Sequence, residues 1–277
     1  MLDIHSTVKL NSGYEMPMLG FGVFQVKEGA ECEQAVREAL AAGYRHIDTA
    51  AVYGNEASVG KALADCGLPR QDVFVTTKVW ISEFGTDKTR KACQKSLSLL
   101  RLDYVDLYLI HWPVRQGVIE AWQAMQALRD EGLCRSIGIS NFTVRRMEEA
   151  FFPHTDEMPA VNQVELHPFN ARKDVRDYCA AKGIRVEAYS PLVRGQRMDD
   201  ATLKDVAANC GKSPAQILIR WGLQHGIVTI PKSVRPERIR ENADVYDFEI
   251  SPADMARLDA LDQGTPALSW RPEEGWF

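Results

Sequence analysis

Short apolar runs rich in β-branched residues alternate along the chain with longer segments of helical periodicity. In those segments apolar residues recur three or four positions apart, as in Cys32, Val36, Ala39 and Leu40. The runs that predict strands are Met18–Phe21, Tyr44–Asp48, Val73–Lys78, Tyr104–His111, Arg135–Ser140, Ala160–Val164, Ile184–Tyr189 and Ile227–Ile230. This alternation predicts eight consecutive βα units.

Residues at the ends of the helical segments agree with this prediction. Glycines that suit a helix C-cap follow three of them, at Gly43, Gly67 and Gly132. Two others begin with an N-cap serine and a proline at the first helical position, Ser213-Pro214 and Ser251-Pro252.

The two ends of the chain fall outside the repeating pattern. The segment Val8–Pro17 predicts a hairpin that turns at Asn11–Gly13 and closes the barrel floor. The last helix is expected to end near Leu261. Asp262–Phe277 then predicts an irregular tail with aromatic residues at Trp270, Trp276 and Phe277.

Eight βα units predict a closed (β/α)₈ TIM barrel with its helices outside. The alternative is an open doubly wound sheet, which would carry a G-x-G-x-x-G fingerprint after its first strand. The closest match, Gly20–Gln25, has glutamine in place of the third glycine, and we interpret it as a close backbone approach on the barrel rim. No linker rich in Pro, Ser or Gly interrupts the chain, so residues 1–277 are expected to form a single barrel domain.

Composition and charge narrow the class of protein. The 277 residues fit one barrel, and 45% hydrophobic with 26% charged residues is typical of a soluble protein with a sizeable core. A net charge of −5 gives no footprint for nucleic acid or membrane, and no apolar run approaches the roughly 20 residues that span a bilayer. The start MLDIHSTVKL lacks a basic region followed by a long apolar stretch, so no secretory signal is expected.

The six cysteines are scattered without a C-x-x-C pair, which favours reduced thiols over a zinc site or disulfides. The expectation is a cytoplasmic protein, monomeric or weakly dimeric.

Ionisable residues stand at the ends of successive predicted strands. Asp48, Lys78 and His111 each close an apolar run, and Tyr53 follows in the turn after Asp48. The ends of parallel strands meet on one rim of a barrel, where barrel enzymes place their active sites. An ammonium group beside Tyr53 would lower the pKa of the phenol, Asp48 would keep Lys78 charged, and a neutral His111 would orient a substrate oxygen or relay a proton. The group suits proton transfer to a carbonyl oxygen.

Each of these residues also has a structural explanation when taken singly. Asp48 could cap a turn, Tyr53 could line a wall, Lys78 could be a surface cation, and His111 could be hydrogen-bonded in the core. Their shared position at strand ends favours the joint, functional interpretation.

A metal-dependent barrel hydrolase is the alternative enzyme class. Glu165 and His167 form an E-x-H pair on a predicted strand, and with His111 they could hold a metal ion. Pro168 follows at once, and no nearby cysteine or second paired histidine completes a ligand set, so no metal is expected.

At these same residues the sequence resembles the aldo-keto reductase superfamily. The matching segments are GYRHIDTAAVYGNE (Gly43–Glu56), TTKVW (Thr76–Trp80), DLYLIHWP (Asp106–Pro113), GISNF (Gly138–Phe142), NQVELHP (Asn162–Pro168), AYSPL (Ala188–Leu192) and IPKSVRPERIREN (Ile230–Asn242). They occur in family order over essentially the whole chain, and the compact length resembles bacterial members related to diketogluconate reductases.

The resemblance implies reduction of aldehydes and ketones with NADPH, with Tyr53 as general acid and Asp48, Lys78 and His111 completing a catalytic tetrad. It places the nicotinamide carboxamide on Ser140, Asn141 and Gln163, with Tyr189 stacked on the ring. The full set of cofactor contacts that it implies is Val23, Phe24, Ser140, Asn141, Gln163, Tyr189, Ser190, Pro191, Leu192, Ile230, Pro231, Lys232, Ser233, Val234, Arg235, Arg238, Glu241 and Asn242. A non-catalytic nucleotide-binding subunit is a further alternative, because the fold also serves in regulatory roles.

A basic cluster after the last predicted strand favours a phosphorylated cofactor. Lys232, Arg235 and Arg238 lie at a rim where barrels often bind phosphate, and the arginine fork suits phosphate oxygens. By resemblance, Lys232 and Arg238 bind the 2′-phosphate of NADPH, and Glu241 and Asn242 meet the adenine. The alternative is a solvated helix face of alternating charge.

The substrate pocket is expected to be open, because the chain enters the next helix soon after His111-Trp112-Pro113. Phe24 stands where many relatives have tryptophan. The residues expected to line the pocket are Phe24, Trp80, His111, Trp112 and Trp270. Arg194 is expected to fold over the cofactor's pyrophosphate. The physiological carbonyl compound cannot be named from these residues.

Overall fold

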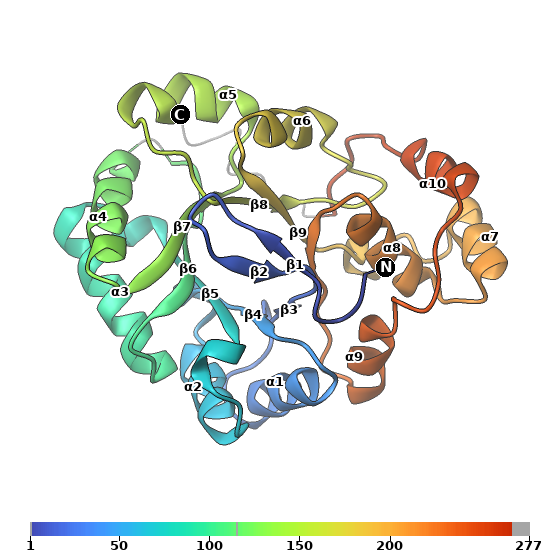
Figure 1. Cartoon of the computed structure of the whole chain (residues 1–277), viewed down its shortest axis with the longest axis horizontal. Coiled ribbons are helices and arrows are strands. Elements are labelled where there is room, and N and C mark those ends of the chain that lie inside the picture. Colours follow the sequence, from blue (N-terminus) through green and yellow to red (C-terminus); the bar gives the residue numbers. More distant parts are fainter. Residues whose placement is uncertain (1, 115, 268–277) are drawn as a thin grey trace.

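In the computed structural model, which describes residues 2–114 and 116–267, parallel strands form a barrel wall with helices outside (Figure 1). Within these residues the wall is an eight-stranded sheet in the order β10-β9-β8-β7-β6-β5-β4-β3. Its strands are β3 (Phe21–Gly22), β4 (His46–Asp48), β5 (Phe74–Val79), β6 (Val105–Ile110), β7 (Cys134–Ser140), β8 (Val161–Glu165), β9 (Arg185–Tyr189) and β10 (Val228–Ile230). Sequence neighbours are also neighbours in space, as consecutive βα units require.

Backbone hydrogen bonds between the segments around β3 and β10 bring the two edges of the sheet together. Leu19 forms a parallel bridge with Thr229, whose N–H donates to Met18 O at 2.8 Å. Gly20 N–H donates to Thr229 O at 3.0 Å. The predicted TIM-barrel fold is confirmed. β3 is shorter than predicted because Leu19 and Gly20 take part in this closing bridge.

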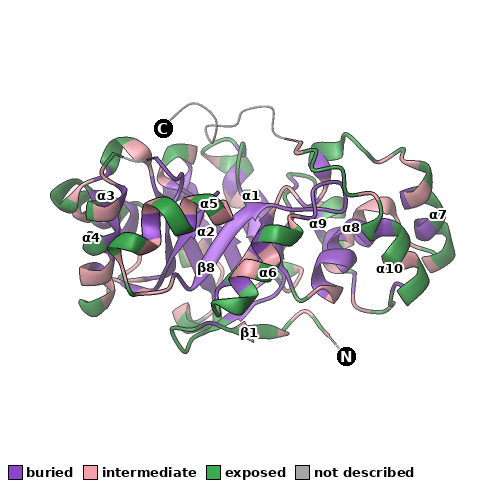
Figure 2. Ribbon diagram, turned by 90° about the horizontal axis from the view of Figure 1, so that it is seen from above, coloured by how far each residue is buried: buried purple, intermediate pink, exposed green. Residues whose placement is uncertain are grey.

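The helices lie outside the barrel, with exposed outer faces and buried inner faces (Figure 2). The longer ones are α1 (Ala30–Ala41), α2 (Glu56–Asp65), α3 (Thr86–Leu100), α4 (Val118–Asp130), α6 (Lys173–Ala181), α7 (Ala201–Cys210), α8 (Pro214–Gln224), α9 (Pro236–Ala243) and α10 (Pro252–Asp259). Single turns are α5 (Val144–Arg146), η1 (Ala51–Tyr53), η2 (Arg70–Asp72), η3 (Ile81–Glu83), η4 (Met147–Phe151), η5 (Phe152–His154) and η6 (Val193–Gly195).

The predicted caps are confirmed. Gly43 has φ 100°, a left-handed conformation that glycine tolerates best. Ser213 forms a capping box with Gln216, and Ser251 accepts a hydrogen bond from Asp254 N–H. α10 ends at Asp259, close to the predicted boundary. No helix among the described residues is long and apolar enough to cross a membrane.

An antiparallel hairpin covers one end of the barrel, at the centre of Figure 1. It consists of β1 (Thr7–Lys9) and β2 (Glu15–Pro17) and turns where the sequence predicts. Leu10 and Met16 on the hairpin are buried against residues of the lumen: Phe74, Leu107, Leu109, Ala160, Val161 and Val228. This apolar layer is the floor of the barrel.

Above the floor, the lumen is polar, and Gly20 makes room for it. A Cβ atom on Gly20 would lie 2.5 Å from Nδ1 of His46. The close backbone approach predicted for this segment therefore occurs, but inside the barrel, against an imidazole ring.

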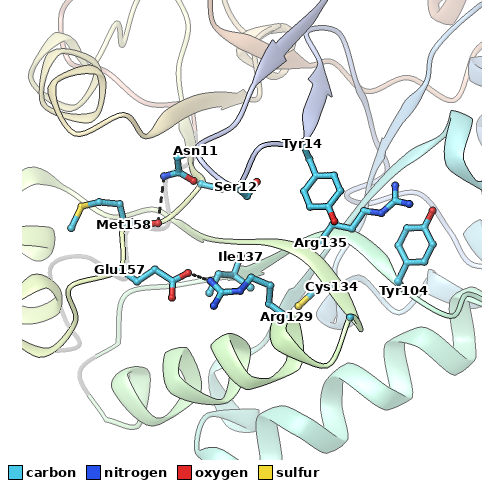
Figure 3. A pocket seen from close by; sticks show the side chains of 12 residues that line it. Asn11, Ser12, Tyr14, Tyr104, Arg129, Cys134, Arg135, Ile137, Glu157 and Met158 are labelled. Carbon is cyan, nitrogen blue, oxygen red and sulfur yellow. Dashed lines mark hydrogen bonds and ion pairs between the residues drawn. The ribbon is translucent and has the colours of Figure 1, made fainter.

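A cavity of about 710 Å³ lies beside the hairpin (Figure 3). Its charged groups are already paired: Arg135 with Asp106 at 3.1 Å, and Arg129 with Glu157. It borders the starts of β7 and β8 and the hairpin tip. It is therefore at the opposite end of the barrel from the predicted catalytic residues.

Candidate active site

A cavity of about 980 Å³ opens at the carboxyl ends of the strands. Each strand of the barrel, or the residue just after it, contributes to its wall: Gly22, Asp48, Trp80, His111, Ser140, Gln163, Tyr189 and Ile230. This is the rim where the sequence places the catalytic residues.

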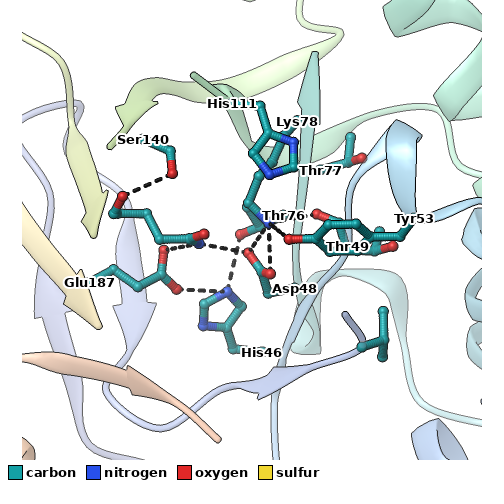
Figure 4. A network of polar contacts seen from close by, with 12 residues as sticks. His46, Asp48, Thr49, Tyr53, Thr76, Thr77, Lys78, His111, Ser140 and Glu187 are labelled. Carbon is teal, nitrogen blue, oxygen red and sulfur yellow. Dashed lines mark hydrogen bonds and ion pairs between the residues drawn. The ribbon is translucent and has the colours of Figure 1, made fainter. Parts of the chain in front are cut away.

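A buried ion pair between Lys78 and Asp48 lies at the cavity, and of the two only Asp48 lines it (Figure 4). Lys78 Nζ donates to Oδ1 and Oδ2 of Asp48 at 2.7 and 2.8 Å, and to the carbonyl of Thr49 at 2.8 Å. Its remaining short contact is with the hydroxyl of Tyr53, at 3.4 Å. Lys78 is fully buried, so its charge acts on Tyr53 with little screening by water. The structure thus brings Asp48, Tyr53 and Lys78 together.

The loop that carries Tyr53 is held by a buried asparagine. Asn55 accepts a hydrogen bond from the Thr49 hydroxyl at 2.8 Å. Its Nδ2 donates to the carbonyls of Val23 and Val26, at 2.9 and 3.1 Å. Asn55 therefore fixes the turn after β4 to the segment after β3.

The electrostatic environment of Tyr53 corrects one expectation. The prediction that the pKa of Tyr53 is lowered is wrong: burial first, and then the carboxyl groups of Asp48 and Glu187, raise its pKa well above the ordinary value. Burial and these carboxyl groups outweigh the nearby ammonium group of Lys78, and Glu187 is a second carboxyl group that the strand pattern did not reveal. The phenol therefore keeps its proton at neutral pH.

His111 is neutral, as expected. Burial, and then the positive charge of Lys78, lowers its pKa well below the ordinary value. Its ring meets Tyr53 and Trp80 edge to face, with centroids 5.6 and 5.2 Å away. Its Nδ1 has no hydrogen-bond partner among the described residues. A neutral imidazole beside the Tyr53 ring can donate one hydrogen bond to a substrate oxygen.

Amide and hydroxyl groups gather on the wall next to the tetrad. Asn141 Nδ2 donates to the carbonyl of His111 at 2.9 Å, and its Oδ1 accepts from the Tyr189 hydroxyl at 2.8 Å. Ser140 Oγ donates to the carbonyl of Gln163 at 2.8 Å, and Gln163 Nε2 donates to Asp48 at 2.7 Å. The residues predicted to hold a carboxamide thus form one hydrogen-bonded cluster on the cavity wall.

Strained backbone is concentrated around this cavity. Gln25, Asn141, Ser190 and Arg194 line it and have φ values of 59°, 68°, 50° and 52°. Left-handed conformations of non-glycine residues cost free energy and occur mostly where a site requires them.

Most of the predicted phosphate-binding residues line the cavity. Lys232, Ser233 and Arg238 line the cavity, with Glu241 and Asn242 on the same face of α9. In the described part of the chain, no ion pair engages the exposed side chains of Lys232 and Arg238. Two unpaired cations at a cavity rim suit an anionic group.

Some predicted contacts do not line the cavity. Among the described cofactor contacts these are Val23, Pro231, Val234 and Arg235. Lys78 also does not line it, and its side chain is fully buried. Phe24, Trp80 and Trp112 do line it, whereas Trp270 lies outside the described residues.

The aldo/keto reductase family model matches residues 18–263. The chain belongs to this family. Glyoxal reductase of Bacillus subtilis (strain 168) is 48% identical over 261 residues, which are 94% of this chain and 94% of that protein. The protein is therefore an oxidoreductase of the aldo/keto reductase family.

Solved structures of aldo/keto reductases have the same fold. A reductase from Brucella melitensis superposes with a TM-score of 0.89 at 46% identity and covers 93% of this chain and 99% of its own. An aldo-keto reductase from Bombyx mori, solved in complex with NADP, superposes with a TM-score of 0.89 at 37% identity over 97% and 96% of the two chains.

Sequence reasoning missed part of this aldo/keto reductase cavity. Gln25, Val52, Met198 and the first turn of α8, at Ser213–Ala215, also line it. Arg194 Nη2 donates to Gln25 Oε1 at 3.0 Å, which links two of the loops around the cavity. The Ser213-Pro214 cap was a signal for the α8 turn, but a cap by itself does not show that a helix begins at a cavity.

The residues of the alternative metal site do not converge in this aldo/keto reductase. His167 Nε2 lies 3.0 Å from Glu165 Oε1, and neither residue lines the cavity that His111 lines. Among the described residues, no three His, Cys, Asp or Glu side chains lie close enough to hold a metal ion. The geometry gives the hydrolase alternative no support.

Proposed function

We propose that this protein reduces aldehydes and ketones to alcohols with NADPH, and that Tyr53 is the general acid. The observation that carries the proposal is the buried ammonium group of Lys78, which joins the carboxylate of Asp48 to the hydroxyl of Tyr53 at the cavity wall. A phenol that keeps its proton and has a cation beside it is suited to protonate an oxygen that becomes negative.

The side chains that line the cavity suit a phosphorylated dinucleotide. Ser140, Asn141 and Gln163 offer polar groups to a carboxamide, and Tyr189 offers a ring. Lys232 and Arg238 offer cations to a 2′-phosphate, and Arg194 would fold over the pyrophosphate. The Bombyx mori relative in complex with NADP supports this choice of cofactor. When bound, NADPH supplies the hydride that reduces the carbonyl carbon.

Proton transfer is the part of the reaction that the chain itself performs. His111, neutral, would hold the carbonyl oxygen by a hydrogen bond. As that oxygen gains negative charge, Tyr53 donates its phenolic proton to it, and the alcohol forms. The remaining phenolate is stabilised by Lys78 and recovers a proton from solvent.

The substrate is proposed to be a small carbonyl compound. Phe24, Trp80 and Trp112 give one side of the cavity an apolar wall, and the similarity to glyoxal reductase supports small aldehydes and dicarbonyls. A relation to diketogluconate reductases, a cytoplasmic location and a monomeric or weakly dimeric state stay predictions.

The proposal is tested by Tyr53→Phe. Loss of the proton donor should lower kcat by about 10³-fold, within the range typical of general acid catalysis, and leave the Kd for NADPH unchanged. Tyr14→Phe is the matched control, because Tyr14 is exposed on the hairpin at the other end of the barrel. NADPH oxidation is followed by absorbance, and NADPH binding by fluorescence.

Each alternative has its own signature. If Tyr53→Phe keeps wild-type turnover, another group donates the proton. Stoichiometric zinc or manganese in the purified protein would favour the hydrolase. NADPH binding without turnover over aldoses, ketoacids, methylglyoxal and aromatic aldehydes would favour a non-catalytic subunit.

A further inference from the structure

Beneath the cavity, the lumen holds a second carboxyl group that the proposed chemistry does not use (Figure 4). Glu187 on β9 is fully buried and does not line the cavity. It is the register partner of Gln163 on β8, and its Oε2 accepts a hydrogen bond of 2.8 Å from Gln163 Nε2. The same nitrogen donates to Oδ2 of Asp48 at 2.7 Å. Gln163 therefore links the carboxylate of the tetrad to a carboxyl group below it.

These two hydrogen bonds fix the orientation of the Gln163 amide. A primary amide has two N–H donors on its nitrogen and an acceptor oxygen. Because carboxyl groups of Asp48 and Glu187 both accept from the nitrogen, the oxygen is the group left for a ligand in the cavity. If a nicotinamide carboxamide binds there, its N–H group would be held by that oxygen.

Neither the cationic group nor the basic group near Glu187 forms an ion pair with it. Lys78 on β5 already donates to both oxygens of Asp48 on β4. His46 on β4 lies closest, with Nε2 3.6 Å from Glu187 Oε1. Burial, and then the charge of Lys78, lowers the pKa of His46 to about 3, so its imidazole is neutral.

The other surroundings of Glu187 add no positive charge. Tyr53, from the turn after β4, keeps its proton. The register partners on the neighbouring strands are Gln163 on β8 and Val228 on β10, and neither titrates. A buried carboxylate without a cation is costly, so the neutral acid is favoured.

Burial, and then the negative charge of Asp48, raises the pKa of Glu187 to about 8. The Gln163 hydrogen bond and the charge of Lys78 act in the opposite direction but are weaker. The carboxyl group is therefore neutral below pH 8 and ionised above it. Ionisation places a second negative charge beside Asp48, directly under the cavity.

We infer that Glu187 is a positioning residue for the cofactor, an inference that rests on the function proposed above. Its carboxyl group holds the amide of Gln163, and its charge sets how strongly the site prefers oxidised to reduced cofactor. The oxidised nicotinamide ring carries a positive charge and the reduced ring is neutral. A negative charge under the ring therefore favours the oxidised form.

The test compares the Kd values of NADPH and NADP⁺ between pH 6.5 and 9.5, measured by quenching of tryptophan fluorescence. Trp80 and Trp112 line the cavity and serve as reporters. The ratio of the two Kd values cancels the titration of the cofactor phosphate, which both forms share. In the wild type the ratio Kd(NADPH)/Kd(NADP⁺) should rise on the order of tenfold around pH 8, as for one charge acting over roughly 10 Å at an effective dielectric constant of about 20.

In Glu187→Gln the ratio should change less than twofold, because the side chain cannot ionise. Glu56→Gln is the matched control. Glu56 is also buried with a raised pKa, but it accepts a hydrogen bond from the Thr77 hydroxyl, and in the described part of the chain no hydrogen bond joins it to Gln163 or Asp48. In this variant the ratio Kd(NADPH)/Kd(NADP⁺) should rise around pH 8 as it does in the wild type.

The inference is overturned if Kd(NADPH)/Kd(NADP⁺) of the wild type does not change with pH, or if the rise around pH 8 also occurs in Glu187→Gln. If neither cofactor form binds at any pH, the proposed function fails, and the inference fails with it. If the inference alone fails, both cofactor forms still bind, and the ratio of their Kd values either does not change with pH or changes equally in the wild type and in Glu187→Gln.

A measurement on the wild type covers the case in which Glu187→Gln does not fold. Carbon-13 NMR of protein labelled at the glutamate carboxyl carbons should show one resonance with a midpoint near pH 8. The absence of any glutamate midpoint between pH 7 and 9 overturns the inference.

Discussion

Lys78 and Asp48 show how two charged side chains can be stabilised in the interior of a protein. Lys78 and Asp48 are almost fully buried, and the ammonium group makes three short hydrogen bonds, two of them to Asp48. Removing two charges from water costs several kcal/mol each, and only a pair with such geometry offsets that cost. The pair is therefore expected to matter for folding as well as for chemistry.

Lys78→Met should lower the free energy of unfolding by about 3–5 kcal/mol, because it leaves the Asp48 carboxylate buried without its partner. Urea denaturation at pH 7 measures this loss. Adding Asp48→Asn to Lys78→Met should recover part of it, since no uncompensated charge then remains. Lys61→Met is the control, because Lys61 pairs with Asp65 at an exposed position and its loss should change stability little. Equal losses in the two lysine variants would contradict this account of the buried pair.

At this scale the sequence could predict which residues meet, but it could predict only part of how their pKa values are shifted. The strand ends brought Asp48, Lys78 and His111 to one rim, and the neutral state of His111 followed from its cationic neighbour. The predicted direction of the Tyr53 pKa shift was wrong, because burial, and then the carboxyl groups of Asp48 and Glu187, raise this pKa. Glu187 lies between Val186 and Ala188 in a predicted strand. Nothing in that pattern indicates that Glu187 and Asp48 accept hydrogen bonds from the same side-chain amide, that of Gln163.

One face of helix α9 lines the cavity, and the helical spacing of its residues determines which side chains lie on that face. Arg238, Glu241 and Asn242 are spaced three and four residues apart, so they share one face, and that face lines the cavity. Arg235 is the N-cap residue and does not line the cavity, and neither does the exposed Val234. The sequence identified the basic cluster. It could not assign each member to a side, because the turn between β10 and α9 has no period.

Neutralising Lys232 and Arg238 together (Lys232→Met, Arg238→Gln) should raise the Kd for NADPH by about 100-fold, through loss of charge-assisted hydrogen bonds to phosphate. The Kd for NADH should change less than threefold, because NADH has no 2′-phosphate. Arg240→Gln is the control on the same helix, since Arg240 pairs with Glu38 at 2.7 Å and does not line the cavity. Equal weakening of both cofactors would show that the cluster does not bind the 2′-phosphate.

At the scale of the whole molecule, the two ends of the barrel differ in structure. The hairpin and the apolar floor occupy one end, and the tetrad and the cavity occupy the other. The sequence predicted both ends, because strand count and strand-end chemistry are local patterns. It could not predict the polar layer between them, where Gly20, His46 and Glu187 meet, because those contacts join residues far apart in the chain.

This division predicts that the floor can be weakened without changing the chemistry. Met16 is fully buried in the apolar layer, so Met16→Ala should lower the free energy of unfolding by about 2–4 kcal/mol through lost contacts and a residual cavity. Because the tetrad lies at the other end, kcat/KM at 25 °C should stay within twofold of the wild type. Leu99→Ala, at an exposed position on α3, is the control and should cost much less stability. A large fall in kcat/KM for Met16→Ala, with the protein still folded, would show that the floor shapes the site through the polar layer above it.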